Sequence, residues 1–456
     1  MNRTQFVSLF SAVALSWGHP LRAQSLDFTS LDSTIKKEMA QLKTPGAAVA
    51  IVQGDRVVYM KGFGVANIET GEPVRPEMLF RLGSTTKMLT AAALVSMAVE
   101  GKLDLDKPLA SYLSTLPPRL GRVTSNQLLS HTAGILDRAP MYGAHEEGAL
   151  GTGISKWTDE WLFTDPGQIF SYSNPGYWLA GYLLEVRSGR PFSDAMETQL
   201  FRPLGMVRTT FRPLVAMTYP LAIGHRVTTE GSPAVVRPFA DNAESWPAGS
   251  AFSSVEELSR FVIAFLNGGR LEGKQVLDPK VIALLSSPHT ALPGQPVDTY
   301  GYGLILSYTR GVRMLEHGGS RLGYGSTIRM APDERVGVII LTNQSGVTLS
   351  ATAMKALEIT LPLRPKPTSP AKATLQITAD DIVRYVGVYE NGDDRVEFTA
   401  DSGRLFVTRD QRMSELVKRA GDRYEAATGG SYVFSVIVDG RARYVTSGSR
   451  SFSRSR

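Results

Sequence analysis

The feature that most constrains this chain is a short polar segment, Gly83-Ser84-Thr85-Thr86-Lys87, that leads directly into the apolar run Met88 to Val99. A helix that is apolar on almost every side is normally buried, so we expect a core helix that stops at Gly101. Helical residues three apart are neighbours on one face, so Ser84 Oγ and Lys87 Nζ can come within hydrogen-bond reach. Burial would lower the pKa of the lysine and make it a base for the serine hydroxyl. The segment therefore predicts an activated nucleophile at the start of a buried helix.

The first residues have the pattern of a targeting signal. Arg3 gives a positive start, Phe6 to Trp17 is apolar, and Ala23 is a small residue at the end of the segment. We expect residues 1–23 to be a cleaved signal peptide and the remaining protein to be exported, either periplasmic or secreted. The alternative is a membrane anchor, but the apolar stretch is shorter than the roughly 20 residues of a spanning helix, and no later segment qualifies. We therefore expect no stable membrane span after cleavage.

Length and composition narrow the class of protein. A chain of 456 residues exceeds one ordinary core and favours two domains. The absence of cysteine excludes disulfides, thiol catalysis and thiolate metal sites. Removal of residues 1–23 takes away Arg3 and Arg22 and lowers the formal net charge from +6 to +4, which is too small to suggest a nucleic-acid partner. The basic ending, with Arg450, Arg454 and Arg456 among serines, is expected to fray in solvent.

Residues 24–361 have the pattern of an α+β domain. Strand-like runs cover residues 47–53, 57–61, 303–308, 312–316, 326–330 and 336–342. Helical runs cover residues 32–42, 125–129, 175–188, 254–266 and 349–359, besides the helix after Lys87. Strands near both ends of the domain that flank a helical middle predict an antiparallel sheet assembled from both termini and flanked by helices, with a separate helical region.

The remainder predicts a second, smaller domain. Residues 362–374 are proline-rich and polar, which is typical of a stiff linker. Residues 375–456 form an all-β domain in this interpretation. Its strand-like runs, separated by turn residues, cover 385–389, 395–399, 404–408, 432–438 and 443–445. This pattern predicts an antiparallel meander or a barrel.

The Ser-x-x-Lys spacing alone is a weak signal, because Ser33 and Lys36 match it too. Those residues lie among charged neighbours, so we expect them on a helix surface with a hydrated lysine. For Ser84 the alternative is a hydroxyl that only caps the helix. We prefer the nucleophile, since a lysine that leads into a buried helix needs a compensating role.

Two further motifs accompany the serine. Tyr172-Ser173-Asn174 precedes Pro175, a residue favoured at the start of a helix. Taken alone, the tyrosine could be a packed aromatic and the asparagine a cap, and Tyr389-Glu390-Asn391 repeats the pattern at a strand end. His317-Gly318-Gly319-Ser320 follows a strand-like run, and its glycines would let a substrate lie close to the backbone. Its alternative is a plain turn.

The three motifs occur along the chain in the order and at the spacing of one group of enzymes. Together they resemble the motifs of the serine β-lactamases and penicillin-binding proteins, in particular the class C-like branch with D-aminopeptidases and family VIII esterases. The resemblance covers about residues 30–360 and extends to residues 128–135, 203–206 and 301–304. It implies a β-lactamase/DD-peptidase-like fold and makes His131 a structural loop residue. The C-terminal domain resembles the lipocalin-like β-domain of some peptidases in this group.

Residue by residue, the resemblance implies that Ser84 is the nucleophile and Lys87 its proton acceptor or electrostatic activator. Tyr172 would share the proton transfer, and either Lys87 or Tyr172 could be the base. Asn174 would orient the substrate amide and Lys87. The backbone N–H groups of Ser84 and Ser320 would form the oxyanion hole, at about 3 kcal/mol per donor. The substrate would also contact His317, Gly318 and Gly319. No metal or cofactor is implied.

One departure affects the predicted substrate. His317-Gly318-Gly319 stands where β-lactamases and DD-peptidases usually carry Lys-Thr-Gly, so a permanent cation is replaced by a side chain that titrates near pH 6.5. Within the resemblance this favours a hydrolase of small esters or peptides, including substrates with D-amino acids. A class C-like β-lactamase and a penicillin-binding sensor that acylates without turnover are the alternatives. The oligomeric state and the role of the β-domain stay open.

Overall fold

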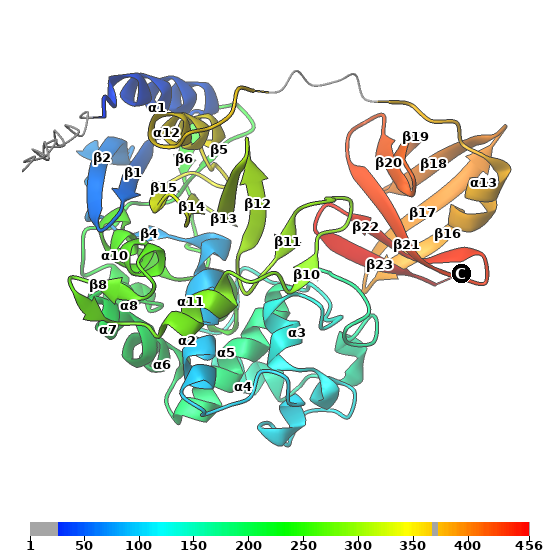
Figure 1. The fold of residues 1–456 in the computed structure, drawn as a ribbon, viewed down its shortest axis with the longest axis horizontal. Helices are drawn as coiled ribbons and strands as arrows, with labels where there is room; N and C mark the ends of the chain where they lie inside the picture. Colours follow the sequence, from blue (N-terminus) through cyan, green and yellow to red (C-terminus); the bar gives the residue numbers. More distant parts are fainter. Residues whose placement is uncertain (1–25, 367–372, 456) are drawn as a thin grey trace, which may run out of the picture.

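The computed structural model describes residues 26–366 and 373–455. The predicted signal peptide, residues 1–23, and part of the predicted linker lie outside these ranges. Figure 1 shows a larger α+β part beside a small β-barrel. No helix among the described residues is long and apolar enough to cross a membrane.

The α+β part is built on an antiparallel sheet whose central strands come from both ends of the domain. Across the sheet, the strands are β10 (Thr290–Ala291), β11 (Thr299–Tyr300), β12 (Ile305–Thr309), β13 (Val312–Arg321), β14 (Tyr324–Ala331), β15 (Val336–Thr342), β1 (Gly46–Gln53), β2 (Arg56–Asn67) and β3 (Glu72–Pro73). The N-terminal β1 pairs with the late β15, from Ala47 opposite Thr342 to Gln53 opposite Val336. The expected assembly of the sheet is thus present.

Helices cover both faces of the sheet, and the side chains of β1 point alternately into the two cores that these helices form. One set of side chains, Ala47, Val49 and Ile51, packs in a core with α1 (Thr29–Leu42) and α12 (Ser350–Thr360). The alternate set, Ala48, Ala50 and Val52, packs in the larger core with α2 (Thr86–Val99) and α10 (Val255–Leu266). Successive side chains of a strand point to opposite faces, so a sheet covered on both faces needs this continuous apolar run.

The predicted core helix is α2. Its residues from Thr86 to Met97 are all buried. It packs against α5 (Asn174–Ser188), α9 (Trp246–Gly249) and α11 (Pro279–Leu285). The rest of the helical region comprises α3 (Ser125–Leu129), α4 (Ala149–Ile154), α6 (Phe192–Met196), α7 (Arg202–Leu204) and α8 (Pro213–Ala216).

The C-terminal part is a closed barrel of eight antiparallel strands. They are β16 (Gly387–Asn391), β17 (Asp394–Asp401), β18 (Arg404–Arg409), β19 (Arg412–Ala420), β20 (Arg423–Ala426), β21 (Ser431–Val438), β22 (Arg441–Ser447) and β23 (Arg450–Arg454). The sequence predicted five of them and missed β19, β20 and β23. In β19 only Ser414 and Leu416 are buried, so the strand carries little apolar signal. Tyr385, expected in a strand, ends α13 (Ala379–Tyr385) and packs in the core of the barrel.

The expectation that the basic ending frays was wrong. β23 closes the barrel by pairing with β22 and β16, and Phe452 within it is fully buried. The Arg454 guanidinium donates hydrogen bonds to the carbonyl oxygens of Ala442 and Val386. The run Arg-Ser-Phe-Ser-Arg therefore has an inward apolar residue flanked by arginines whose donors are used. Arg456 lies outside the described residues.

Candidate active site

Ser84 lies in a tight 3-10 turn, Gly83–Thr85, that runs into α2. The N-cap residues of this turn and of α2 are Leu82 and Thr85, so Ser84 is the capping residue of neither. Gly83 has φ +57°, and a Cβ there would lie 2.6 Å from Ser320 N. A Cβ on Gly319 would collide with the Leu82 carbonyl oxygen. Two glycines thus let β13 lie directly against the turn that carries Ser84.

Lys87 is fully buried beside this serine. Its Nζ lies 3.4 Å from Ser84 Oγ, 2.7 Å from Asn174 Oδ1 and 2.8 Å from the Ala248 carbonyl oxygen. Burial lowers the pKa of Lys87 to about 7; nearby Arg450 and Arg321 lower it further, and Asp137 opposes them. In the neutral amine, two N–H groups can serve the two carbonyl-type oxygens, which leaves the lone pair for Ser84 Oγ. By contrast, Ser33 and Lys36 are exposed on α1, as predicted.

The orientation of Asn174 is fixed by an aspartate that the sequence analysis did not single out. Ser173, not Asn174, caps α5, because its Oγ accepts a hydrogen bond from Gly176 N–H. Asn174 donates from its backbone N–H and its Nδ2 to Asp137 Oδ1, at 2.8 and 3.0 Å. The amide oxygen of Asn174 therefore faces Lys87.

Tyr172 lies over Lys87, with 4.7 Å between the Lys87 Nζ and the ring centroid. Burial raises the pKa of Tyr172 well above its ordinary value, and its hydrogen bond with Ser84 opposes this only in part. The hydroxyl is therefore protonated at neutral pH. His131 supports the segment from behind: its ring packs 4.2 Å from the Tyr172 ring, and its Nδ1 accepts a hydrogen bond from Ser173 N–H. This placement agrees with a structural role for His131.

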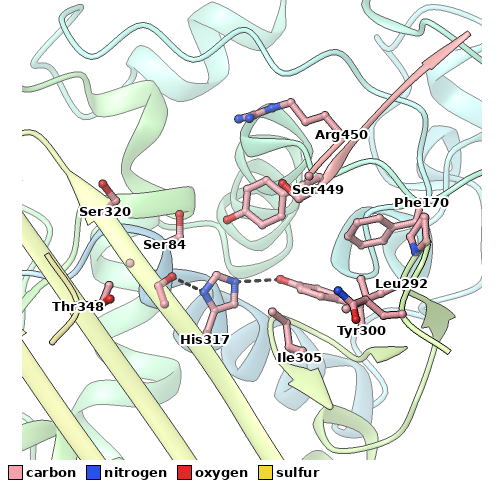
Figure 2. A pocket seen from close by; sticks show the side chains of 16 residues that line it. Ser84, Phe170, Leu292, Tyr300, Ile305, His317, Ser320, Thr348, Ser449 and Arg450 are labelled. Carbon is pink, nitrogen blue, oxygen red and sulfur yellow. Dashed lines mark hydrogen bonds between the residues drawn. The ribbon is translucent and has the colours of Figure 1, made fainter. Parts of the chain in front are cut away.

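His317 lines the same cavity as Ser84 and Tyr300 (Figure 2). Its Nδ1 lies 2.6 Å from the Gly318 carbonyl oxygen, which can only accept, so Nδ1 carries the proton. Its Nε2, 3.1 Å from the Tyr300 hydroxyl, is then the acceptor. Burial, with a smaller effect of Lys87, lowers the pKa of His317 to about 4. The expectation of titration near pH 6.5 is thereby corrected, because burial keeps this side chain neutral at pH 7.

The barrel reaches into the site through the turn between β22 and β23. Arg450 Nε lies 2.6 Å from Asp137 Oδ2, and Arg450 Nη2 contacts the same oxygen. The backbone continues this contact, since Tyr172 N–H donates to the Ser449 carbonyl oxygen at 2.8 Å. Sequence reasoning missed both Asp137 and Arg450, because neither belongs to a local motif and 313 positions separate them. They meet only when the barrel is docked.

Two cavities meet at Ser84 and Ser320. The larger, of about 440 Å³, extends along His317, Gly318 and Gly319 toward Tyr300 and the barrel turn. The smaller, of about 150 Å³, extends past Asn174 and Ser245 to Arg321 at the end of β13. The predicted site residues thus lie together around Ser84. Within the described residues no group of histidine, aspartate or glutamate side chains could hold a metal ion.

Comparisons with known proteins agree with this geometry. The family described as Beta-lactamase matches residues 31–361. A penicillin-binding protein 4 from Amycolatopsis lactamdurans is 29% identical over 67% of this chain and 82% of that protein. A D-aminopeptidase from Gluconobacter oxydans (strain 621H) is 29% identical over 76% of this chain but only 64% of its own length, so the chain spans less than two thirds of that relative.

The similarity to solved structures includes the barrel. SurE, which has also been solved with D-Leu, superposes with a TM-score of 0.76 at 26% identity over 93% of this chain and 98% of that one. The predicted architecture, a β-lactamase/DD-peptidase-like domain followed by a small all-β domain, is confirmed. Because the family match covers most of the sequence, this chain belongs to the beta-lactamase family.

Proposed function

We propose that the protein is a serine hydrolase that cleaves small esters or peptides, including substrates with D-amino acids, through an acyl-enzyme on Ser84. The observation that carries the proposal is the buried Lys87 amine, whose pKa is lowered to about 7 and whose Nζ lies 3.4 Å from Ser84 Oγ. A weak nucleophile next to a base that is partly neutral at pH 7 is the arrangement that acyl transfer requires.

Each residue of the site has its own role in the proposed acyl transfer. Neutral Lys87 takes the Ser84 proton while Ser84 Oγ bonds to the carbonyl carbon, and the N–H groups of Ser84 and Ser320 stabilise the oxyanion. Lys87 returns the proton through the Tyr172 hydroxyl to the leaving oxygen or nitrogen as its bond to carbon breaks. Lys87 then takes a proton from a water molecule while the water oxygen bonds to the acyl carbon, and it returns this proton to Ser84 Oγ as the ester bond breaks. Tyr172 acts as a proton donor, since it is protonated at neutral pH.

The substrate class rests on the neutral histidine and on the relatives. A neutral His317 gives no permanent cation for a β-lactam carboxylate where the related enzymes usually have lysine. One relative is named a D-aminopeptidase, and SurE has been solved with D-Leu. A class C-like β-lactamase and a non-turnover penicillin-binding protein are the second candidates, because another relative is named a penicillin-binding protein.

Activity-based labelling tests the proposal. A fluorophosphonate probe should label the wild type and the Ser33→Ala control, and Ser84→Ala should lose the label. On a panel of p-nitrophenyl acetate, D- and L-alanine p-nitroanilide and nitrocefin, we expect turnover of the ester or the D-anilide. Labelling that survives Ser84→Ala would refute the mechanism. Rapid nitrocefin turnover alone would favour the β-lactamase, and a stable penicillin adduct without turnover would favour the sensor.

We further propose that the protein is exported after cleavage behind Ala23, which rests on the N-terminal sequence pattern. Protein isolated from the periplasm or the medium should begin at Gln24. An intact N-terminus on protein found in the cytoplasm would refute export.

A further inference from the structure

The smaller cavity beside Ser84 ends at a cation. Arg321 is the last residue of β13, and its side chain lines this cavity together with Asn174 and Ser245. Arg321 Nη1 lies close to Gly249, whose added Cβ would meet it at 3.8 Å and the Gly83 carbonyl carbon at 3.6 Å. Gly249 therefore lies between the Arg321 guanidinium and the Gly83–Thr85 turn that carries Ser84.

Within the described ranges, no carboxylate pairs with this arginine. Its Nη2 donates a hydrogen bond to Ser245 Oγ at 3.1 Å, and its buried Nε has no hydrogen-bond partner among the residues that the structure describes. Burial, with a contribution from Arg81, lowers the pKa of Arg321 to about 9, so the group is still a cation at pH 7. Buried charges in proteins are normally paired, because desolvation of an unpaired charge is costly.

The nearest acid is already occupied. Asp241 Oδ1 accepts from Arg81 Nη2 at 2.6 Å and from Trp246 Nε1 at 3.3 Å. Its Oδ2 lies 3.2 Å from His145 Nδ1. Asp241 therefore neutralises the fully buried Arg81, and the cluster keeps one positive charge that faces the cavity.

The position of Tyr172 indicates which half of the substrate occupies each of the two cavities. Its hydroxyl delivers the proton to the leaving group in the proposed reaction, and Tyr172 lines the larger cavity but not the smaller one. The leaving group therefore departs into the larger cavity. The acyl group that stays on Ser84 extends past Asn174 toward Arg321.

We propose that the smaller cavity is a carboxylate subsite for the acyl group, with Arg321 as the cation that binds it. The inference rests on the proposed function and names its substrate class: acyl groups that end in a carboxylate a short distance from the scissile carbonyl. A cavity of 150 Å³ holds about five water-sized groups, which fits two methylenes and a carboxylate, as in a succinyl group.

The experiment compares succinyl p-nitroanilide with its neutral isostere, succinamoyl p-nitroanilide. A hydrogen-bonded charge pair should raise kcat/KM for the acid over the amide by about 10- to 100-fold. Arg321→Met should reduce this ratio to near one, and Arg321→Lys should keep part of it. The matched control Arg202→Met, which removes an exposed arginine paired with Glu197, should leave the ratio unchanged.

A measurement on the wild type covers the case in which Arg321→Met does not fold. Succinate should inhibit p-nitrophenyl acetate hydrolysis at about 10-fold lower concentration than succinamate. Ser84-dependent hydrolysis without any preference for the acid would overturn the subsite and leave the proposed function intact. Absence of Ser84-dependent hydrolysis would overturn the proposed function. Calorimetric titration with succinate would then decide the subsite, and no binding would overturn it.

Discussion

Replacing Arg450 with methionine is expected to move the acid limb of the activity profile to higher pH. In the proposed mechanism the unprotonated Lys87 is the active form, and Arg450 lowers its pKa in two ways. Its own charge repels the Lys87 ammonium, and it neutralises Asp137, which favours that ammonium. Losing Arg450 removes the repulsion and leaves Asp137 unpaired, so both changes raise the pKa of Lys87.

The size of the shift follows from Coulomb's law. Asn174 and Asp137 stand between Lys87 and Arg450, so the two cations are not in contact. For an assumed separation of about 7 Å and an effective dielectric constant of about 20, two unit charges interact by about 2.4 kcal/mol, or about 1.7 pKa units. Arg450 is 42% exposed, so solvent and salt should reduce its effect to about 0.5 to 1 unit. Asp137→Asn should shift the limb the opposite way, to lower pH, by about 1 unit, because that carboxylate is only 4% exposed.

The assay is the pH dependence of kcat/KM for p-nitrophenyl acetate at constant ionic strength, whose acid limb reports the free-enzyme pKa of the base. The wild-type limb should lie near pH 7. Arg138→Met is the matched control, since Arg138 pairs with Asp393 where the barrel meets the α+β part. Thermal unfolding checks that each variant is folded. A limb that stays in place, or that moves the same way in Arg450→Met and Asp137→Asn, would refute the reasoning.

Three further changes test other contacts. Lys87→Met should lower kcat/KM by about 10²- to 10⁴-fold in steady-state assays, and Lys36→Met should not; equal effects would deny Lys87 its role as base. Gly319→Ala should lower kcat by about 10-fold or more, because its Cβ collides with the Leu82 carbonyl oxygen and displaces the strand beside the oxyanion site; unchanged kcat would mean that this close approach is not needed. Phe452→Ala should cost about 3 to 5 kcal/mol of barrel stability in denaturant titrations, and a loss below 1 kcal/mol would contradict its place in the core.

The larger domain was predictable because its signals are local. The apolar run after Lys87 can be stable only as a buried helix, and the strand predicted at residues 336–342 matches β15 residue for residue. Capping residues mark helix starts in the same way: Ser254 accepts a hydrogen bond from Glu257 N–H at the start of α10. The three motifs around Ser84 could be proposed together because they follow a known family order.

Only five of the eight barrel strands were predicted, because a barrel strand buries few side chains and carries a weak apolar pattern. β19 buries only Ser414 and Leu416 and exposes the apolar Met413, and β23 is too short to show alternation beyond Phe452. In such strands the pairing partner, rather than the local pattern, decides the structure. The arginines that made the ending look solvated instead donate hydrogen bonds across the barrel and to Asp137.

By itself, the sequence determined which residues could do chemistry: a serine three positions before a lysine, a Tyr-x-Asn segment and a glycine-rich strand. Only the tertiary structure decided their protonation states. The pKa of Lys87 depends on burial and on the charges of Asp137, Arg321 and Arg450, and that of His317 depends on burial. Electrostatic energies depend on distance in space and on exclusion of water, so no local pattern could have predicted them.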